Sequence, residues 1–194
     1  MNADLFDHAG AYVKSGNIKQ AIDQAELKLR GLDETYFHPI LGASLLHQSE
    51  ELVSWITSFY QEVSRKRPAR ALYFEMYGFD INTDQWYIDG FAYETVGTIE
   101  DVDWLADYEL DMATSQPFVL TGFELMQEAF EAYMDEEEPD ELEEARDIAE
   151  LLVILRLQEL LAQAHQLAKA RRLDWGTIVL LATAHDYDMI LESK

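Results

Sequence analysis

The pattern of hydrophobic and polar residues predicts helices in the first third of the chain. Apolar residues recur every three or four positions within residues 3–32, where Gly16 separates two short helices. We expect Asn17 to cap the second of these helices. The same period continues across residues 45–64 and indicates an amphipathic helix of about 20 residues, which ends before Pro68.

The first two helices carry a recognisable local pattern in "AGAYVKSGNIKQAIDQAELKL". It resembles part of one tetratricopeptide unit, with a small residue and Tyr in the first helix, Gly at the turn, and Ala21 and Ala25 in the second. Such units stack in about three or more copies, and the sequence contains no second copy. We therefore interpret this segment as an ordinary helical hairpin.

The middle of the chain differs in residue composition and pattern. The stretches "ALYFEMYGFDI" and "QWYIDGFAYETVG" are rich in aromatic and β-branched residues and lack a helical period. They predict two or three antiparallel strands joined by a turn. Residues 98–111 are expected to form a short helix or a loop, and residues 115–124 another extended piece.

The last third is predicted to contain two helices and a strand. One helix covers residues 123–134, and a longer one runs from Asp140 to about Arg172, with Asp140 as N-cap and Glu143 completing a capping box. About 32 residues would span about 48 Å, more than the roughly 40 Å width of a compact domain. The long helix should therefore bend, break or project into a partner subunit. Residues 176–185 favour a strand, with a helix as the alternative.

These elements together predict a single α+β domain over residues 1–194. Its parts are a helical region 1–67, an acidic aromatic sheet region 71–122, a helical hairpin 123–173 and a terminal strand 176–185. We expect helical N- and C-terminal parts packed on a small, mainly antiparallel central sheet.

Charge is unevenly distributed along this chain of net charge −24. Residues 71–145 contain 22 Asp and Glu and no Lys, Arg or His, whereas the remainder is nearly neutral. Such a field repels nucleic acid and anionic lipid surfaces and attracts a basic protein. Solubility alone is the competing explanation.

The residues we expect to contact a basic partner lie in the second half of the sheet region. Trp104 and Tyr108 could anchor a binding hot spot among carboxylates. The predicted partner-binding residues are Glu100, Asp101, Asp103, Trp104, Asp107, Tyr108, Glu109 and Asp111. The basic cluster at residues 65–70 suits the end of a helix, or it lies against the acidic segment of the same chain.

Familiar enzyme chemistry is weakly represented. The chain has no Cys, and it contains no nucleophile elbow or phosphate-binding loop. A glycosidase-like carboxylate pair is conceivable for Glu75 with Asp89 or Glu94. His185 and Asp186 are adjacent, but neighbours in sequence should point apart.

Two patterns in the sequence resemble metal sites, but a structural explanation fits each of them better. Asp80, Asn82 and Asp84 have calcium-loop spacing, but the required Gly and terminal Glu are missing, so a hairpin turn fits better. Carboxylates on two helices could hold magnesium, but solvated helix faces explain them more simply. These residues are Glu124, Glu128, Glu131, Glu143, Glu144, Asp147 and Glu150. We thus assign no catalytic, cofactor-binding or metal-binding residue.

Three hypotheses for function follow. The first is an acidic interaction protein that binds a basic protein partner through residues 71–145, as inhibitors and immunity proteins do. The alternatives are a carboxylate- or metal-dependent hydrolase and a helix-mediated homodimeric scaffold without a catalytic site. The first residues lack the pattern of a signal peptide and the longest apolar run is too short to cross a bilayer, so we expect a cytoplasmic protein.

Overall fold

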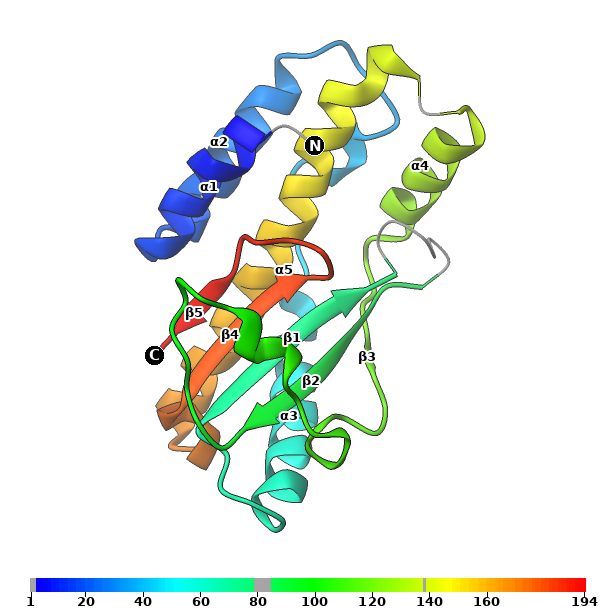
Figure 1. The fold of residues 1–194 in the computed structure, drawn as a ribbon. Coiled ribbons are helices and arrows are strands. Elements are labelled where there is room, and N and C mark those ends of the chain that lie inside the picture. The colour runs from blue at the N-terminus through cyan, green and yellow to red at the C-terminus, as the bar shows by residue number, and fades with distance from the viewer. Residues whose placement is uncertain (1–2, 79–84, 138) are drawn as a thin grey trace.

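A mixed β-sheet forms the centre of the molecule. The computed structural model describes residues 3–78, 85–137 and 139–194. Among these residues, five strands form one sheet of order β3-β2-β1-β4-β5 (Figure 1). The strands are β1 Ala71–Tyr77, β2 Tyr87–Tyr93, β3 Phe118–Val119, β4 Val179–Ala184 and β5 Leu191–Ser193. Only the β1–β4 pair is parallel, so the sheet is mainly antiparallel and the predicted α+β class is confirmed.

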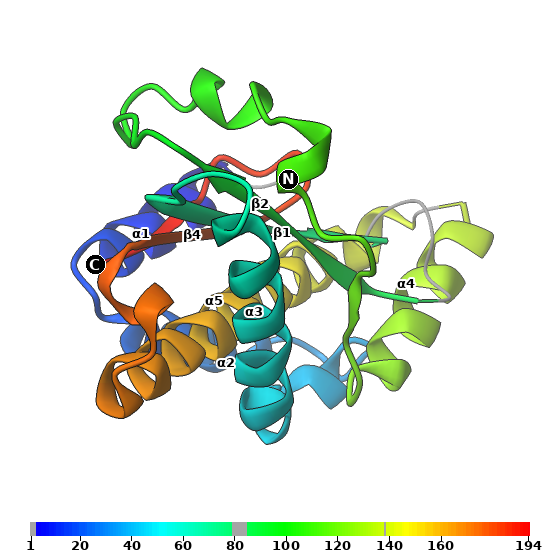
Figure 2. The ribbon, with the colours of Figure 1, turned by 90° about the horizontal axis from the view of Figure 1, so that it is seen from below.

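Helices cover one face of the sheet. The described residues form α1 Ala3–Lys14, α2 Ile18–Arg30, α3 Ser49–Ser64, α4 Glu124–Asp135 and α5 Glu143–Arg171. Helices α3 and α5 pack beneath the sheet, and the loop that follows β2 lies on its opposite side (Figure 2). Alternate residues of β1 face the helices because side chains alternate across a strand. Leu72, Phe74 and Met76 accordingly join the large helical core.

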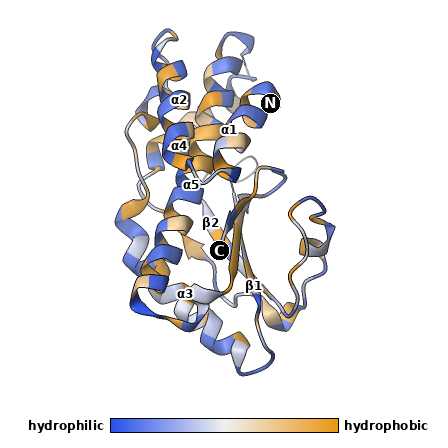
Figure 3. Ribbon diagram, turned by 90° about the vertical axis from the view of Figure 1, so that its left-hand side faces the viewer, coloured by the Kyte–Doolittle hydropathy of each residue, from blue (hydrophilic) through white to orange (hydrophobic). Residues whose placement is uncertain are grey.

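Helix α5 crosses the whole structure without a break. Its 29 residues correspond to a length of about 43 Å. Its contacts include α2, α3 and β4, which belong to the same chain. Figure 3 shows hydrophobic positions, in orange, along the middle of this helix and in the strands. Of the three predicted alternatives, a break is excluded because α5 is one continuous helix, and elements of its own chain cover it on several sides.

Strand β4 lies in the interior of the sheet, between β1 and β5. Its sequence is a continuous apolar run rather than an alternating one because both of its faces are buried. Its last five residues are all buried. The short edge strand β5 was not expected from the sequence, since three residues carry too little pattern to be recognised.

Of the two predicted helix caps, Asn17 occupies the N-cap position of α2 as expected, whereas Asp140 does not cap α5. The Asn17 side chain makes no capping hydrogen bond, and its Nδ2 donates to Ser15 Oγ at 3.1 Å instead. Helix α5 begins at Glu143, after a 3-10 turn at Asp140–Leu142, with Leu142 as N-cap and no side-chain cap. Pro139 takes the extended conformation that Asp140 would need as a cap, so Asp140 is already inside the turn.

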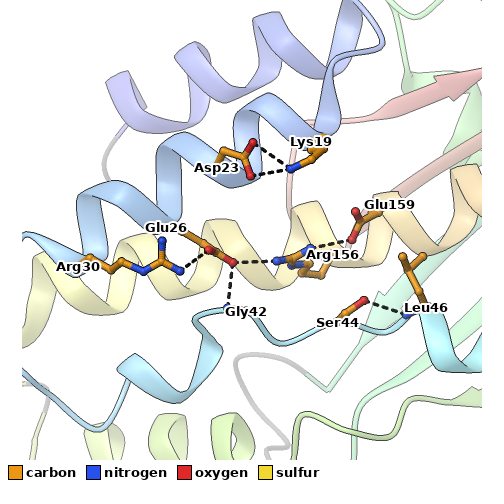
Figure 4. Close-up of polar contacts among 9 residues, drawn as sticks. All are labelled: Lys19, Asp23, Glu26, Arg30, Gly42, Ser44, Leu46, Arg156 and Glu159. Carbon is orange, nitrogen blue, oxygen red and sulfur yellow. Dashed lines mark hydrogen bonds and ion pairs between the residues drawn. The ribbon is translucent and has the colours of Figure 1, made fainter.

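A buried ion cluster joins α2 to α5 (Figure 4). Glu26 accepts hydrogen bonds from Arg30 Nη2 at 2.8 Å, Arg156 Nη2 at 2.8 Å and the Gly42 backbone N–H at 2.9 Å. Arg156 also donates to Glu159 at 2.9 Å. The Glu26 and Arg156 side chains are only 10% and 12% exposed, so each charge depends on the other.

We predict that Glu26→Ala lowers the free energy of unfolding by about 3 kcal/mol, because it leaves the Arg156 charge buried without its main partner. Denaturant unfolding followed by circular dichroism measures this change. Asp23→Ala is the matched control on the same helix, since Asp23 pairs with Lys19 in an exposed position and should cost less than about 1 kcal/mol. Equal losses in the two variants would contradict the role of the cluster.

A histidine lies fully buried near the end of α5. His165 is 0% exposed, its Nδ1 lies 2.7 Å from Ser193 Oγ, and its ring stacks on Trp175. Burial lowers the pKa of His165 to about 4, and the positive charge of Lys169 acts in the same direction. The folded state therefore holds this imidazole neutral at pH values where an unfolded chain protonates it.

The free energy of unfolding should accordingly fall as the pH drops from about 6.5 to about 4. In this interval the unfolded state binds more protons at His165 than the folded state does. The resulting decrease in the free energy of unfolding reaches roughly 3 kcal/mol. Above pH 6.5 the contribution is fully present. Unfolding curves at several pH values should show that the free energy of unfolding falls less at acid pH in His165→Asn than in the wild type. His8→Asn, at an exposed position, is the matched control. Identical pH profiles of His165→Asn and wild type would disprove this.

Candidate functional site

The acidic loop, residues 94–111, is laid across the outer face of the sheet (Figures 1 and 2). The Tyr93 hydroxyl donates to the Leu105 carbonyl at 2.5 Å, and the Trp104 ring nitrogen donates to the Thr98 carbonyl at 3.1 Å. The Trp104 ring also packs edge-on against Tyr93 at 5.0 Å. Leu105 joins a second apolar cluster with outward residues of β1, β2 and β4, including Tyr93. The loop is therefore a fixed layer with its own small core.

The carboxylates of the acidic loop point to solvent. All seven are exposed: Glu94, Glu100, Asp101, Asp103, Asp107, Glu109 and Asp111. Tyr108 is 43% exposed and lies 4.5 Å from the ring of Phe91. Trp104, in contrast, is partly buried beneath the loop and fixes its path. Seven of the eight predicted partner-binding residues are thus accessible, and Trp104 has a structural role.

Sequence reasoning missed Leu110, the most exposed large hydrophobic residue of the described chain. Its side chain is 85% exposed between Glu109 and Asp111. No periodicity identifies it, because a single apolar residue in a loop has no pattern. The only available signal was its isolation among carboxylates.

Part of the acidic loop is neutralised within the chain. Arg67 lies 3.2 Å from Asp111, 3.6 Å from Glu109 and 3.7 Å from Glu94, and Lys66 donates to the Asp111 carbonyl. The basic cluster after α3 thus lies against the acidic segment, which was one of the two alternatives left open. Within the described part of the chain, no Lys or Arg forms an ion pair with the four remaining carboxylates from Glu100 to Asp107. These four dominate the field of the loop.

A second polar group, formed around Glu75 by Tyr77 and His185, lies on the same face of the sheet near the C-terminal end of β1. Glu75 accepts a hydrogen bond from Tyr77 at 2.5 Å, and its second oxygen lies 2.9 Å from His185 Nδ1. His185 Nε2 lies 3.6 Å from Asp186, so these neighbours do not point apart as expected. The left-handed backbone of Asp186 (φ 66°) turns its side chain back toward the imidazole.

The predicted carboxylate pair is brought together here. Glu75 and Asp89 are directly opposite in the β1–β2 register, whereas Glu94 lies beyond the end of β2 near Arg67. Burial raises the pKa of Asp89, the Glu75 charge adds to this, and a hydrogen bond from Thr114 opposes it. Burial and Glu75 likewise raise the pKa of Tyr77. Both Glu75 oxygens already have partners, which is the arrangement of a satisfied structural carboxylate.

Five of the seven helix carboxylates are exposed, as expected for solvated helix faces: Glu124, Glu128, Glu131, Glu143 and Glu144. The other two are buried. Asp147 and Glu150 are 4% and 1% exposed, and Arg146 pairs with both. They face inward because α5 is covered on several sides. No group of three or more His, Asp or Glu among the described residues could hold a metal ion. Asp80, Asn82 and Asp84 of the calcium-like spacing lie outside the described residues.

Comparisons of the chain with protein-family models, curated protein sequences and solved structures found no match. No helix in the described part of the chain has the length and apolar composition needed to cross a membrane.

One of the contacts that position the acidic loop is the close approach of Gly97 to the Trp104 ring. A Cβ atom added at Gly97 would lie 2.3 Å from the Trp104 ring, well inside contact distance. We predict that Gly97→Ala displaces the ring and lowers the free energy of unfolding by about 1–3 kcal/mol, as overpacking does. Thermal unfolding and tryptophan fluorescence measure the change. Thr98→Ala, an exposed neighbour, should leave both close to wild type; a wild-type melting temperature for Gly97→Ala would refute the anchoring role.

Proposed function

We propose that the protein is an acidic interaction protein that binds a basic protein partner through the acidic loop. The observation that carries this proposal is the combination of exposed charge and a fixed backbone. Seven exposed carboxylates and the 85% exposed Leu110 lie on a loop tied to the sheet by Tyr93 and Trp104.

Each of these features has a known use at interfaces. Carboxylates of one sign speed the approach of a cationic partner and set the salt dependence of binding. A few side chains, Tyr often among them, contribute most of the affinity of an interface, and Tyr108 is the exposed aromatic residue of the loop. Leu110 adds exposed apolar surface beside it. A loop that is already ordered loses little conformational entropy on binding.

The ion pairs of Arg67 support the proposal that the loop carboxylates bind cationic side chains. This guanidinium lies within 4 Å of three loop carboxylates, so the loop surface accommodates an arginine side chain of the chain itself. An Arg or Lys side chain of a partner would meet carboxylates of the same kind between Glu100 and Asp107. The sign of the field disfavours nucleic acid and anionic membranes. Inhibitors of cationic enzymes and immunity proteins for cationic toxins are the class that fits.

We predict that Asp101→Asn, Asp103→Asn and Asp107→Asn together weaken partner binding about ten- to hundredfold, since three carboxylates facing cations are lost. Wild type and variant are immobilised side by side, and basic proteins are captured from the cells that express the protein. The dissociation constant of the captured protein is then measured at low and moderate salt. Wild-type binding should weaken strongly as salt rises.

A second triple variant is the matched control for net charge. Asp33→Asn, Glu34→Gln and Glu51→Gln remove the same charge from exposed positions outside the acidic loop and should retain binding. Leu110→Ala should weaken binding while leaving stability unchanged, because its side chain is exposed. Equal binding by both triple variants, or no salt-dependent partner at all, would rule out the proposal.

A further inference from the structure

A groove of about 530 Å³ lies between α1 and residues 186–190, which follow β4. Its floor is apolar and preformed. Phe6 of α1 stacks on Tyr187 at 5.8 Å, and Phe6, Met189 and Ile190 are each less than 10% exposed. The volume is within the range of ligand and side-chain pockets in proteins. We call this feature the α1 groove.

The wall formed by residues 186–190 is held from below by buried polar side chains. Thr183 donates toward the carbonyls of Tyr187 and Met189, at 3.1 and 3.0 Å. Gln158 of α5, fully buried, donates to the Met189 carbonyl at 2.6 Å. The groove therefore keeps its shape without an occupant, and binding would not require the wall to be ordered first.

The rim of the α1 groove is mainly acidic. Asp7 stands on α1, and Asp186 and Asp188 stand on the opposite wall, all of them exposed. Lys14 is the single base among the lining residues. An apolar floor between carboxylates is complementary to an apolar side chain that is flanked by cations. It disfavours an anionic ligand or an anionic lipid surface.

The groove is continuous with the acidic loop. Ile190, at the end of the groove wall, belongs to the same apolar cluster as Leu105, and Ile99 and Val102 pack against that cluster. In Figure 1 the segment after β4 (red) passes between α1 and the sheet, and the acidic loop (green) crosses in front of β4. One partner could therefore touch both features.

From these observations we propose that the α1 groove is a second contact for the basic partner and binds a short segment of it in which an apolar side chain is flanked by Lys or Arg. This inference rests on the proposed function. It adds that recognition is not purely electrostatic, because the groove requires an apolar residue between the charges. It also divides the contact surface into two parts that mutations can separate.

The test uses a fluorescent synthetic peptide in which Leu residues alternate with Lys, and fluorescence anisotropy at low salt. Wild type should bind it with a dissociation constant below about 100 µM. Gly10→Met should weaken binding at least tenfold. A Cβ at Gly10 meets only Met189, at 3.8 Å, so the longer side chain extends into the groove, and replacing a helical glycine favours α1.

Two charge variants test the rim. Asp188→Lys should weaken binding at least fivefold, whereas Lys14→Glu should tighten it severalfold, a gain that misfolding cannot produce. A peptide of equal charge in which Gly replaces Leu should bind more weakly and should not respond to Gly10→Met. Melting temperatures near that of wild type would show that the variants are folded.

The outcomes separate this inference from the proposed function. Binding of the Leu–Lys peptide that is lost in Gly10→Met and kept in the triple variant of Asp101, Asp103 and Asp107 supports the α1 groove. Absence of peptide binding, or equal binding by wild type and Gly10→Met, overturns the groove assignment. Capture of a basic protein that depends on the acidic loop would still support the proposed function in that case.

Discussion

The structure depends on the burial of α5. Residues 148–155 of this helix are all buried, and all but Glu150 are apolar, so nearly the whole circumference of the helix is apolar here. Such a helix is stable only when other elements cover it on several sides. Helices α2 and α3 and the sheet provide that cover, and the hairpin of α1 and α2 is held through the same contacts. The positions of α2, α3 and the sheet follow from this requirement.

Because α5 is buried on several sides, its charged side chains need partners of opposite charge. Arg156, Asp147 and Glu150 cannot reach bulk water easily, so each is matched by a nearby charge, from Glu26 for Arg156 and from Arg146 for the two acids. A buried ion needs such a match because removal from water costs several kcal/mol. The acidic character of the chain therefore has two origins. Some carboxylates belong to the interior, and others form the outer surface.

The outer surface is organised by the alternation of strand residues. One face of β1 joins the helical core, and the other presents Tyr73, Glu75 and Tyr77. Aromatic side chains on that face need cover, which the acidic loop supplies with Leu105 and Trp104 on its inner side. Its carboxylates consequently point away from the sheet. The same packing that protects the aromatic face thus creates a fixed acidic surface beside the α1 groove.

Local patterns in the sequence determined the helices and the central hairpin. Helical periodicity predicted all five helices that the structure describes, α1 to α5, and stretches rich in aromatic and β-branched residues predicted β1 and β2. These signals arise from residues close together in the chain. The uneven charge was also readable from the sequence alone. Only the tertiary structure decided that Asp147 and Glu150 are buried, that Arg67 lies against the acidic loop, and that Trp104 is structural while Leu110 is exposed. These facts depend on contacts between residues far apart in sequence, and neither composition nor periodicity records which distant segments meet.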